Sequence, residues 1–255
     1  MKIFVVLTYF QRQFQLNKTL QSIAKTKHDN FEVIIVDDNS TDDIMLPLVL
    51  YPITVIKTKD KTWTDRDIPA NIGFAEALKR GADIIISQNA ECYHVGDVLE
   101  YAEKVTDDSY ISFGCYSLNE EETFKDHDIR EVIRLNDVCA VDDGQNAWYN
   151  HPVHRPVCYD FCAAMTRNTL LKLNGFDERF SFGIGYGDDY LIHRIKTMGL
   201  TVDIPTYPFV VHQWHYSHAA RSDSNELIQK NYQLYNNLIK ENNFKAVHLL
   251  TPNLG

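Results

Sequence analysis

Polar side chains stand directly after several short apolar runs in the first 95 residues. Thr8 ends the first run, Asp37 and Asp38 follow the second, and Asn89 and Glu91 follow a later one. Hydroxyl, amide and carboxylate groups can hydrogen-bond a nucleotide, and a carboxylate can supply a hard oxygen ligand to Mg²⁺ or Mn²⁺. Polar turns also end strands in proteins without such sites, so ordinary turns and caps are the alternative interpretation.

Two further pairs of residues in the second half of the chain have side chains that could act as a general base or as metal ligands. Asp188 and Asp189 follow the run FSFGIGYG and open a helical pattern. A carboxylate at a helix start can be held by backbone N–H groups and can act as a general base toward a hydroxyl. His212 and His215 follow an apolar run and can ligate a metal. A plain helix cap and ordinary core or surface histidines are the alternatives.

The elements that must position these residues follow from the hydrophobic pattern. Short, continuous, β-branched runs predict buried strands at 3–8, 31–36, 53–57 and 83–87. Apolar residues at helical spacing predict helices at 13–26 and 70–80. This order is typical of an α/β fold with a mostly parallel sheet covered by helices. Such sheets bind ligands beyond the carboxyl ends of their strands, where the polar residues stand.

Beyond residue 95 the pattern is less regular. We expect a sequence of short elements: a helix at 95–105, a strand at 110–116, partial helix at 119–134, helices at 168–174 and 189–198, and a strand at 208–212. Residues 142–157 are poor in aliphatic side chains and predict a long loop. A final helix at 224–242 is expected to turn one stripe inward, comprising Leu227, Ile228, Tyr232, Leu234, Tyr235, Leu238 and Ile239.

Composition excludes several classes of protein. The chain has 255 residues, 44% of them hydrophobic, which is enough for one sizeable core. Its formal charge of −10 argues against binding to nucleic acid or to anionic membranes. No run reaches the length of a membrane span or resembles a secretory signal, so we expect a cytoplasmic protein. The five cysteines include no C-x-x-C pair, which favours buried free thiols: Cys92, Cys115, Cys139, Cys158 and Cys162.

The opening of the chain resembles a known family. The segment VVLTYFQRQFQLNKTLQSI, followed by FEVIIVDDNSTDD, resembles the start of family-2 inverting glycosyltransferases with a GT-A fold. The resemblance implies that Thr8, Phe10 and Asp38 hold the nucleotide of a sugar donor, with Asp38 meeting the base. A carboxylate can accept from a pyrimidine N–H, and an aromatic ring can stack on the base. Arg12 and Arg66, with Lys79 as a further candidate, could meet the diphosphate.

A second segment, NIGFAEALKRGADIIISQNAE, resembles the N-x-G, helix, strand and D-x-D part of that family. Asn71 opens it and is assigned to the nucleotide site on this resemblance. Asn89 and Glu91 stand where the two acidic residues of D-x-D usually stand. Asn89 can bond a ribose hydroxyl and Glu91 can bind Mn²⁺ or Mg²⁺. One carboxylate is missing, so metal affinity is expected to be weaker, or metal dependence to be absent.

A third segment, GFDERFSFGIGYGDDYLIHRIKTMG, resembles the acceptor-side motif of the family. Asp188 matches the usual catalytic base, and Asp189 is one residue away and stays an alternative. Phe182 and Tyr186 could stack on the acceptor sugar. Either His212 or His215 is expected to complete the metal ligands. Residues of the predicted loop are further acceptor candidates, although its tryptophan could instead anchor the loop: Trp148, Tyr149, His151, His154 and Arg155.

Together these features predict one GT-A domain over residues 1–255. Residues 1–95 form its nucleotide-sugar-binding half, and residues 96–255 form its acceptor-side half with the C-terminal helix. The expected activity is metal-assisted, inverting transfer of a single sugar from a UDP- or GDP-sugar to a hydroxyl of a glycan or glycoconjugate. The Q-x-x-R-W pattern of processive synthases is absent from the sequence. The alternatives are a nucleotidyltransferase that makes a nucleotide sugar, or an inactive nucleotide- or carbohydrate-binding module of the same fold.

Overall fold

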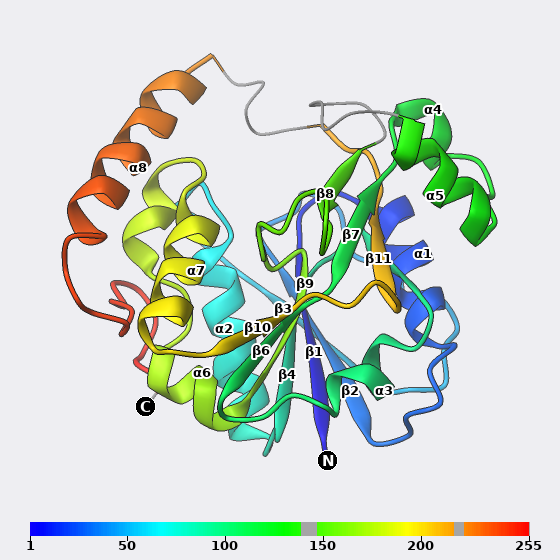
Figure 1. Cartoon of the computed structure of the whole chain (residues 1–255), viewed down its shortest axis with the longest axis horizontal. Coiled ribbons are helices and arrows are strands. Elements are labelled where there is room, and N and C mark those ends of the chain that lie inside the picture. Colours follow the sequence, from blue (N-terminus) through cyan, green and yellow to red (C-terminus); the bar gives the residue numbers. More distant parts are fainter. Residues whose placement is uncertain (139–146, 217–221, 255) are drawn as a thin grey trace.

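The computed structural model describes residues 1–138, 147–216 and 222–254. Strands and short helices alternate along the first half, and helices dominate the end of the chain (Figure 1). The elements are β1 (Ile3–Tyr9), α1 (Gln13–Ile23), β2 (Phe31–Asp37), β3 (Ile53–Lys57), α2 (Asp67–Lys79), β4 (Ile84–Asn89), β5 (Cys92–Val95), α3 (Val98–Ala102), β6 (Ser109–Ser112), β7 (Gly114–Ser117), α4 (Glu120–Thr123), α5 (Ile129–Val138), β8 (Trp148–Asn150), β9 (Cys162–Thr166), α6 (Arg167–Leu173), the 3₁₀ helix η1 (Glu178–Phe182), α7 (Gly187–Thr197), β10 (Thr201–Asp203), β11 (Phe209–His212) and α8 (Ser224–Leu238).

The main sheet has the strand order β10-β6-β9-β4-β1-β2-β3. All neighbouring pairs are parallel except those of β9, which runs antiparallel to both β4 and β6. The four strands and two helices expected before residue 95 are present within a few residues of their predicted bounds. The predicted α/β class with a mostly parallel sheet is therefore confirmed.

Helices cover both faces of this sheet (Figure 1). Because side chains alternate along a strand, Val5 and Leu7 of β1 pack in the same cluster as residues of α1 and α3, whereas Phe4 and Val6 pack with α2, α6 and α7. Close approach of α2 depends on Gly73, since a Cβ there would lie 2.3 Å from Val6 Cγ1. The strands thus have two buried faces, which explains their continuous apolar sequences.

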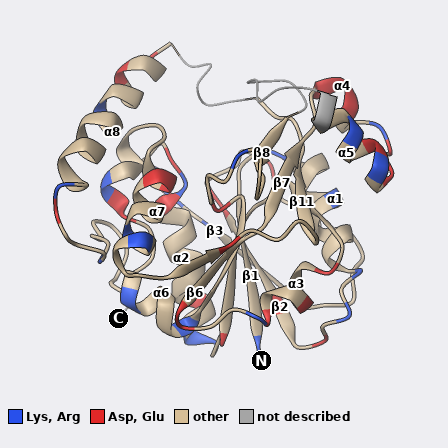
Figure 2. Cartoon of the chain, in the orientation of Figure 1, with Lys and Arg blue, Asp and Glu red and all other residues tan. Residues whose placement is uncertain are grey.

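A second, smaller sheet with the order β5-β11-β7-β8 lies beside the carboxyl ends of the main strands. Strand β11 is parallel to β7 and antiparallel to β5. His212 is the last residue of β11, so this pairing fixes its position. Figure 2 shows acidic and basic residues together on the neighbouring helices α4 and α5. No helix among the described residues is long and apolar enough to cross a membrane.

Several predictions for the second half of the chain are corrected by the structure. The strand expected at 110–116 is two strands in different sheets, β6 and β7, separated by the buried Phe113. Part of the predicted loop 142–157 forms β8, which pairs with β7. Strands β5, β9 and β10 were not predicted. They are only three to five residues long, so their sequences are too short to show a period that marks a strand.

The inner face of α8 follows the predicted apolar stripe only in part: Leu234, Tyr235, Leu238 and Ile239 pack in one cluster with Phe180 and Tyr190. The buried residues of α8 are Ser224, Asn231 and Leu238, whereas Tyr232 is 44% exposed. Asn231 Nδ2 donates to the carbonyls of Phe180 and Gly185, so a hydrogen-bonding residue replaces the expected apolar contact. The described cysteines are free and buried, as predicted, while Cys139 lies outside the described residues.

Candidate active site

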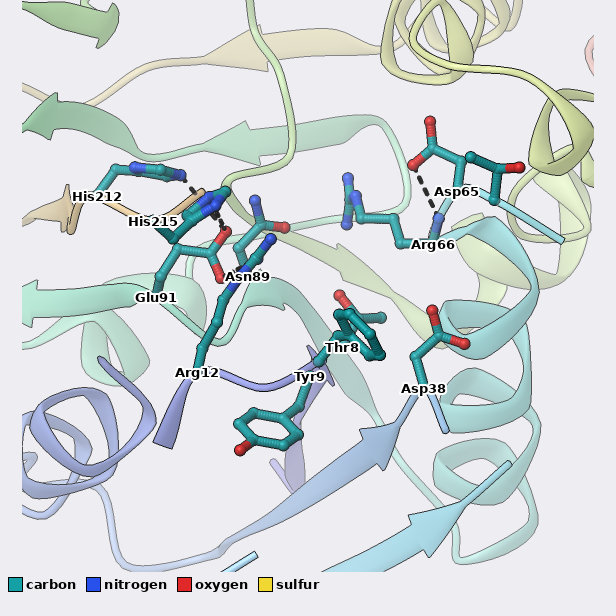
Figure 3. A pocket seen from close by; sticks show the side chains of 12 residues that line it. Thr8, Tyr9, Arg12, Asp38, Asp65, Arg66, Asn89, Glu91, His212 and His215 are labelled. Atoms are coloured by element: carbon teal, nitrogen blue, oxygen red, sulfur yellow. Dashed lines mark hydrogen bonds and ion pairs between the residues drawn. The ribbon is translucent and has the colours of Figure 1, made fainter. Parts of the chain in front are cut away.

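A pocket of about 210 Å³ opens at the carboxyl ends of β1, β2 and β4 (Figure 3). The parallel register places Thr8 beside both Val36 and Asn89, so the three strands end level and present their following residues to one place. The lining residues are Thr8, Tyr9, Phe10, Arg12, Asp38, Thr64, Asp65, Arg66, Asn89, Glu91, His212 and His215. Nine of the site residues predicted from the sequence therefore meet in this pocket: Thr8, Phe10, Arg12, Asp38, Arg66, Asn89, Glu91, His212 and His215.

Asp38 marks one end of the pocket. The indole Nε1 of Trp63 donates to Asp38 Oδ1 at 2.8 Å, and the Lys61 ammonium contacts Asp38 Oδ2. The same ammonium lies 5.0 Å from the centre of the Phe10 ring. An aromatic ring, a carboxylate and a cation thus converge where the sequence predicts the nucleotide base.

Two buried polar atoms in the middle of the pocket have no partner within the described chain: Asn89 Oδ1 and Arg66 Nη1. Buried polar groups are usually hydrogen-bonded, and leaving one unpaired costs about 1–3 kcal/mol. An acceptor and a cationic donor in one pocket are complementary to a ligand that carries both hydroxyl groups and negative charge.

The opposite end of the pocket holds Glu91 between three basic side chains (Figure 3). Arg12 Nη1 lies 2.8 Å from Glu91 Oε2, and the Nε2 atoms of His212 and His215 lie 3.4 and 3.3 Å from Glu91 Oε1. The segment after β11 is held there by Gln213, whose backbone and side-chain N–H groups both donate to the Glu91 carbonyl. One candidate ligand atom from each of Glu91, His212 and His215 lies within 4.8 Å of the others.

The charge state of this cluster is set by its partners. Burial alone would raise the pKa of Glu91, but Arg12 and the two histidines outweigh burial and hold that pKa well below its ordinary value. Burial lowers the pKa of His212 despite the neighbouring carboxylate. An ionised carboxylate beside neutral imidazole is the protonation state that binds a divalent metal.

A second charged cluster forms where the starts of α2 and α7 meet. Arg66 Nη2 contacts the fully buried Asp160 and lies 3.1 Å from Asp188 Oδ1. The two helix starts can approach because residue 187 is glycine: a Cβ there would lie 3.1 Å from Asp67 Oδ1. This contact connects Asp188 to the pocket through Arg66.

Asp188 and Asp189 have different surroundings. Burial and the neighbouring Asp160 raise the pKa of Asp188 to about 8, against the lowering effect of Arg66. Its side chain is still 35% exposed. Asp189 instead accepts a hydrogen bond of 2.6 Å from the Tyr159 hydroxyl. Of the two, only Asp188 shares a partner with the pocket lining.

Some predicted residues lie elsewhere. Asn71 does not line the pocket: its amide donates to the Phe176 carbonyl and Glu178 and accepts from the Phe176 N–H. Asn71 thus ties α2 to the segment that leads into η1, and its contact with a nucleotide stays a prediction. Lys79 has a side chain that is 78% exposed and pairs with Glu76.

Three of the predicted acceptor residues, Trp148, Phe182 and Tyr186, pack against neighbouring side chains. Trp148 stacks on His154 with ring centres 4.3 Å apart, in line with the alternative that it anchors its segment. Tyr186 lies against Tyr232 and Tyr235 of α8, with ring centres 5.5 and 5.7 Å away. The Phe182 ring lies 5.8 Å from an ammonium group of α8, that of Lys230. Contact of these three with an acceptor stays a prediction.

Sequence reasoning missed Tyr9, at the end of β1, and six residues in the loops of the site: Lys61, Trp63, Thr64, Asp65, Tyr159 and Asp160. The six loop residues lie in irregular segments, where no periodic pattern marks a functional position. The loop before α2 is brought to the site by backbone contacts, because the N–H groups of Thr64 and Asp65 both donate to the Ser181 carbonyl. The only available signal was the run of charged and aromatic residues KDKTWTDRD.

Comparison with known proteins defines the family. A family model described as glycosyl transferase family 2 matches residues 4–168. The chain belongs to glycosyl transferase family 2. Its predicted enzyme class, a glycosyltransferase, is thereby confirmed at the level of the family, and the family-2 resemblance with it. Among curated proteins, none matches this chain.

Solved structures of TarS from S. aureus share the fold. TarS 1–349 in complex with UDP has a TM-score of 0.58 and 14% identity, over 91% of this chain and 64% of that one. The same fragment in complex with UDP-GlcNAc gives 0.58 and 14%, over 91% and 65%. The family-2 chain thus spans less than two thirds of these TarS structures, and 39% of a longer one. The predicted GT-A fold is confirmed.

Proposed function

We propose that this family-2 glycosyltransferase transfers one sugar from a nucleoside diphosphate sugar to an acceptor hydroxyl with inversion. One observation carries the proposal: a single pocket is lined by an ionised Glu91 with two histidines and by Arg66, and Arg66 contacts Asp188, which lies outside the pocket lining. Glu91 and the histidines suit a diphosphate and a metal, and Asp188 suits proton removal. Both are needed for this reaction, and each is placed by a different part of the fold.

The nucleotide would lie across Thr8, Phe10 and Asp38. The buried Asp38 is fixed by Trp63, and Phe10 offers a ring for stacking. A uridine donor is supported by the TarS fragments of the same fold, which were solved with UDP and with UDP-GlcNAc. Asn89 Oδ1, unpartnered within the described chain, is suited to accept from a ribose hydroxyl.

Glu91, His212 and His215 fit a divalent metal, because one carboxylate and two imidazoles converge within 4.8 Å. Imidazole ligands favour transition metals over Mg²⁺, so Mn²⁺ is the better candidate of the two predicted ions. When bound, such an ion stabilises the negative charge of a leaving diphosphate. Arg12 lies on the other oxygen of Glu91, where it compensates part of the carboxylate charge.

Asp188 is the proposed general base. Its raised pKa makes it a stronger proton acceptor than an ordinary carboxylate once it is ionised. The acceptor oxygen bonds to the anomeric carbon as the bond from that carbon to the diphosphate oxygen breaks, and the hydroxyl proton passes to Asp188. The attack comes from the face opposite the leaving group, so the configuration inverts. Arg66 Nη1, with no partner among the described side chains, can bond a sugar or phosphate oxygen.

The test is turnover of a panel of nucleotide sugars with Mn²⁺, with water as the default acceptor. Wild-type protein should release a nucleoside diphosphate slowly from at least one donor. Asp188→Asn should lower that rate by about 10²–10⁴-fold while leaving nucleotide affinity unchanged by calorimetry. Asp189→Asn is the matched control, because that residue bonds Tyr159, and it should keep most of the activity.

Each other outcome of this experiment has a clear meaning. A dead Asp189→Asn beside an active Asp188→Asn would reverse the assignment of the base. Binding of a nucleotide sugar without any product would favour an inactive binding module. Formation of a nucleoside triphosphate from pyrophosphate would favour a nucleotidyltransferase, although the family match already argues against that activity.

A further inference from the structure

We propose that Asp160 is a positioning residue that forms a coupled carboxylate pair with Asp188 across the shared guanidinium of Arg66. The inference rests on the proposed role of Asp188 as the base and adds the residue that tunes it. Asp160 does not line the described pocket, and it acts through Arg66 rather than on the reacting atoms.

The pair is built from four separate elements. Arg66 immediately precedes α2, Asp188 lies in the first turn of α7, Asp160 precedes β9, and Ser87 lies on β4. Arg66 Nη2 contacts an oxygen of each aspartate, and Ser87 Oγ donates to Asp160 Oδ2 at 2.9 Å. A single nitrogen therefore bonds two carboxylates that are 28 residues apart in the chain.

The two carboxylates are not equivalent. Asp160 is fully buried and has two partners, the guanidinium and the Ser87 hydroxyl. Asp188 is 35% exposed, shares the guanidinium with Asp160 and lies within hydrogen-bonding reach of the Asp160 carboxyl group. Asp188 is therefore the more exposed and more weakly held member of the pair, and it is the one whose pKa is raised.

The charge balance around Asp188 leads to the same assignment. Arg66 is the cation that faces it, whereas Asp160 contacts the same guanidinium and Asp65 lies close enough to raise the pKa of Asp188. Burial holds the pKa of the adjacent Asp67 well above its ordinary value, so Asp67 adds little negative charge. The hydroxyl of Tyr110 is also close enough to sense both aspartates. Since one guanidinium cannot neutralise two carboxylates, the remaining negative charge raises the proton affinity of the more weakly bound one.

A purely structural role for Asp160 makes a different prediction. If Asp160 served only as the counter-ion that allows Arg66 to be buried, its removal would change stability and leave the titration of Asp188 where it is. The position of that titration therefore separates the two roles, and measuring it requires no knowledge of the donor or acceptor.

The experiment is an NMR pH titration of the full-length protein labelled with ¹³C at the aspartate carboxyl carbons. Asp188 is assigned by the loss of its signal in Asp188→Asn. Wild-type Asp188 should titrate near pH 8, and in Asp160→Asn its midpoint should fall by roughly 1–3 pH units, because a like charge is removed and Arg66 is left to Asp188 alone. An unchanged midpoint in this isosteric variant would overturn the proposal.

Ser87→Ala is the matched control, because it removes a hydrogen bond from Asp160 and keeps the charge. Its Asp188 midpoint should stay close to the wild-type value, and a shift as large as that of Asp160→Asn would contradict an effect of charge. If Asp160→Asn fails to fold, the wild type still decides. The Asp160 carboxyl signal should then show an inflection at the Asp188 midpoint, and the absence of that inflection, or an Asp188 midpoint below pH 5, would overturn the proposal.

The outcome of the NMR titration is independent of the outcome of the turnover assay. If Asp188→Asn retains turnover, the base assignment fails while the coupled pair can still be present in the titration. If Asp188→Asn is inactive and the Asp188 midpoint ignores Asp160, the base stands and the positioning role fails.

Discussion

Two carboxylates at opposite ends of the site, Glu91 and Asp188, have opposite electrostatic surroundings. Glu91 is almost fully buried among Arg12, His212 and His215, which hold its pKa well below the ordinary value. Burial and Asp160 instead raise the pKa of Asp188 to about 8. Two titratable groups whose surroundings shift their pKa values in opposite directions can take different roles in a reaction. These surroundings suit Glu91 to the binding of a metal ion and Asp188 to the transfer of a proton.

The two ends are also assembled differently. Glu91 follows β4 directly, so the parallel sheet places it next to residues that follow β1. Asp188 reaches the site through helix packing, since the start of α7 must lie against the start of α2 with only a glycine hydrogen at the contact. We therefore expect small shifts of α7 to move Asp188 and to leave Glu91 in place. If Asp188 is the base, as proposed, variation in α7 can change the reaction without loss of donor binding.

The largest effect expected from this difference is on the pH dependence of turnover. Since Asp188 must be ionised to accept a proton and titrates near pH 8, the rate should rise with pH and level off above that value. At pH 6 only about 1% of a group with this pKa is ionised, so the rate should be roughly 100-fold below the plateau. Initial rates of donor hydrolysis between pH 5.5 and 9.5, at saturating donor and Mn²⁺, measure this.

Nucleotide affinity provides the control for that profile. Because Glu91 stays ionised over the whole range, calorimetric binding of UDP with Mn²⁺ should change much less than the rate. A rate that is already maximal at pH 6 would show that Asp188 is an ordinary carboxylate or is not the base.

Glu91→Gln should have the next largest effect and should act on binding. The substitution removes the charge between Arg12 and the two histidines, so Mn²⁺-dependent nucleotide affinity should fall by about 10–100-fold. The dissociation constant of UDP with and without Mn²⁺ checks this. The Asp188 midpoint should stay near its wild-type value, and an equal loss of affinity without Mn²⁺ would contradict the metal role.

The nucleotide end of the site was largely predictable from the sequence, and the reason is geometric. Each strand end was visible as the end of an apolar run, and parallel strands bring their carboxyl ends to one edge. The sequence pattern alone therefore predicts that Thr8, Asp38 and Asn89 lie together, and all three line the pocket. For Asn71 the resemblance carries less weight, because its amide is used inside the fold by Phe176 and Glu178, and its contact with a nucleotide stays a prediction.

The acceptor end could be predicted only in part. The acidic pair was visible as a helix start, but a choice between Asp188 and Asp189 depends on which one Arg66 reaches. Asp160 carried no signal, since it lies in an irregular segment, and the strand that follows it inserts antiparallel into the sheet. Such a contact depends on tertiary packing, which local patterns do not encode.

The smallest expected effect is on stability, and it tests whether ionised Asp188 destabilises the folded protein. The folded-state pKa of about 8 lies above the ordinary value of 3.8. The contribution of protonated Asp188 to the free energy of unfolding is therefore fully present below about pH 4 and is lost as the pH rises through 8. Asp188→Asn, which mimics the protonated form, should melt a few degrees above wild type at pH 9 and at the same temperature at pH 4. Asp189→Asn is the control and should show no such gain. Equal melting temperatures of wild type and Asp188→Asn at pH 9 would mean that the cluster accommodates the ionised base without strain, and the contrast with Glu91 would then lie in catalysis alone.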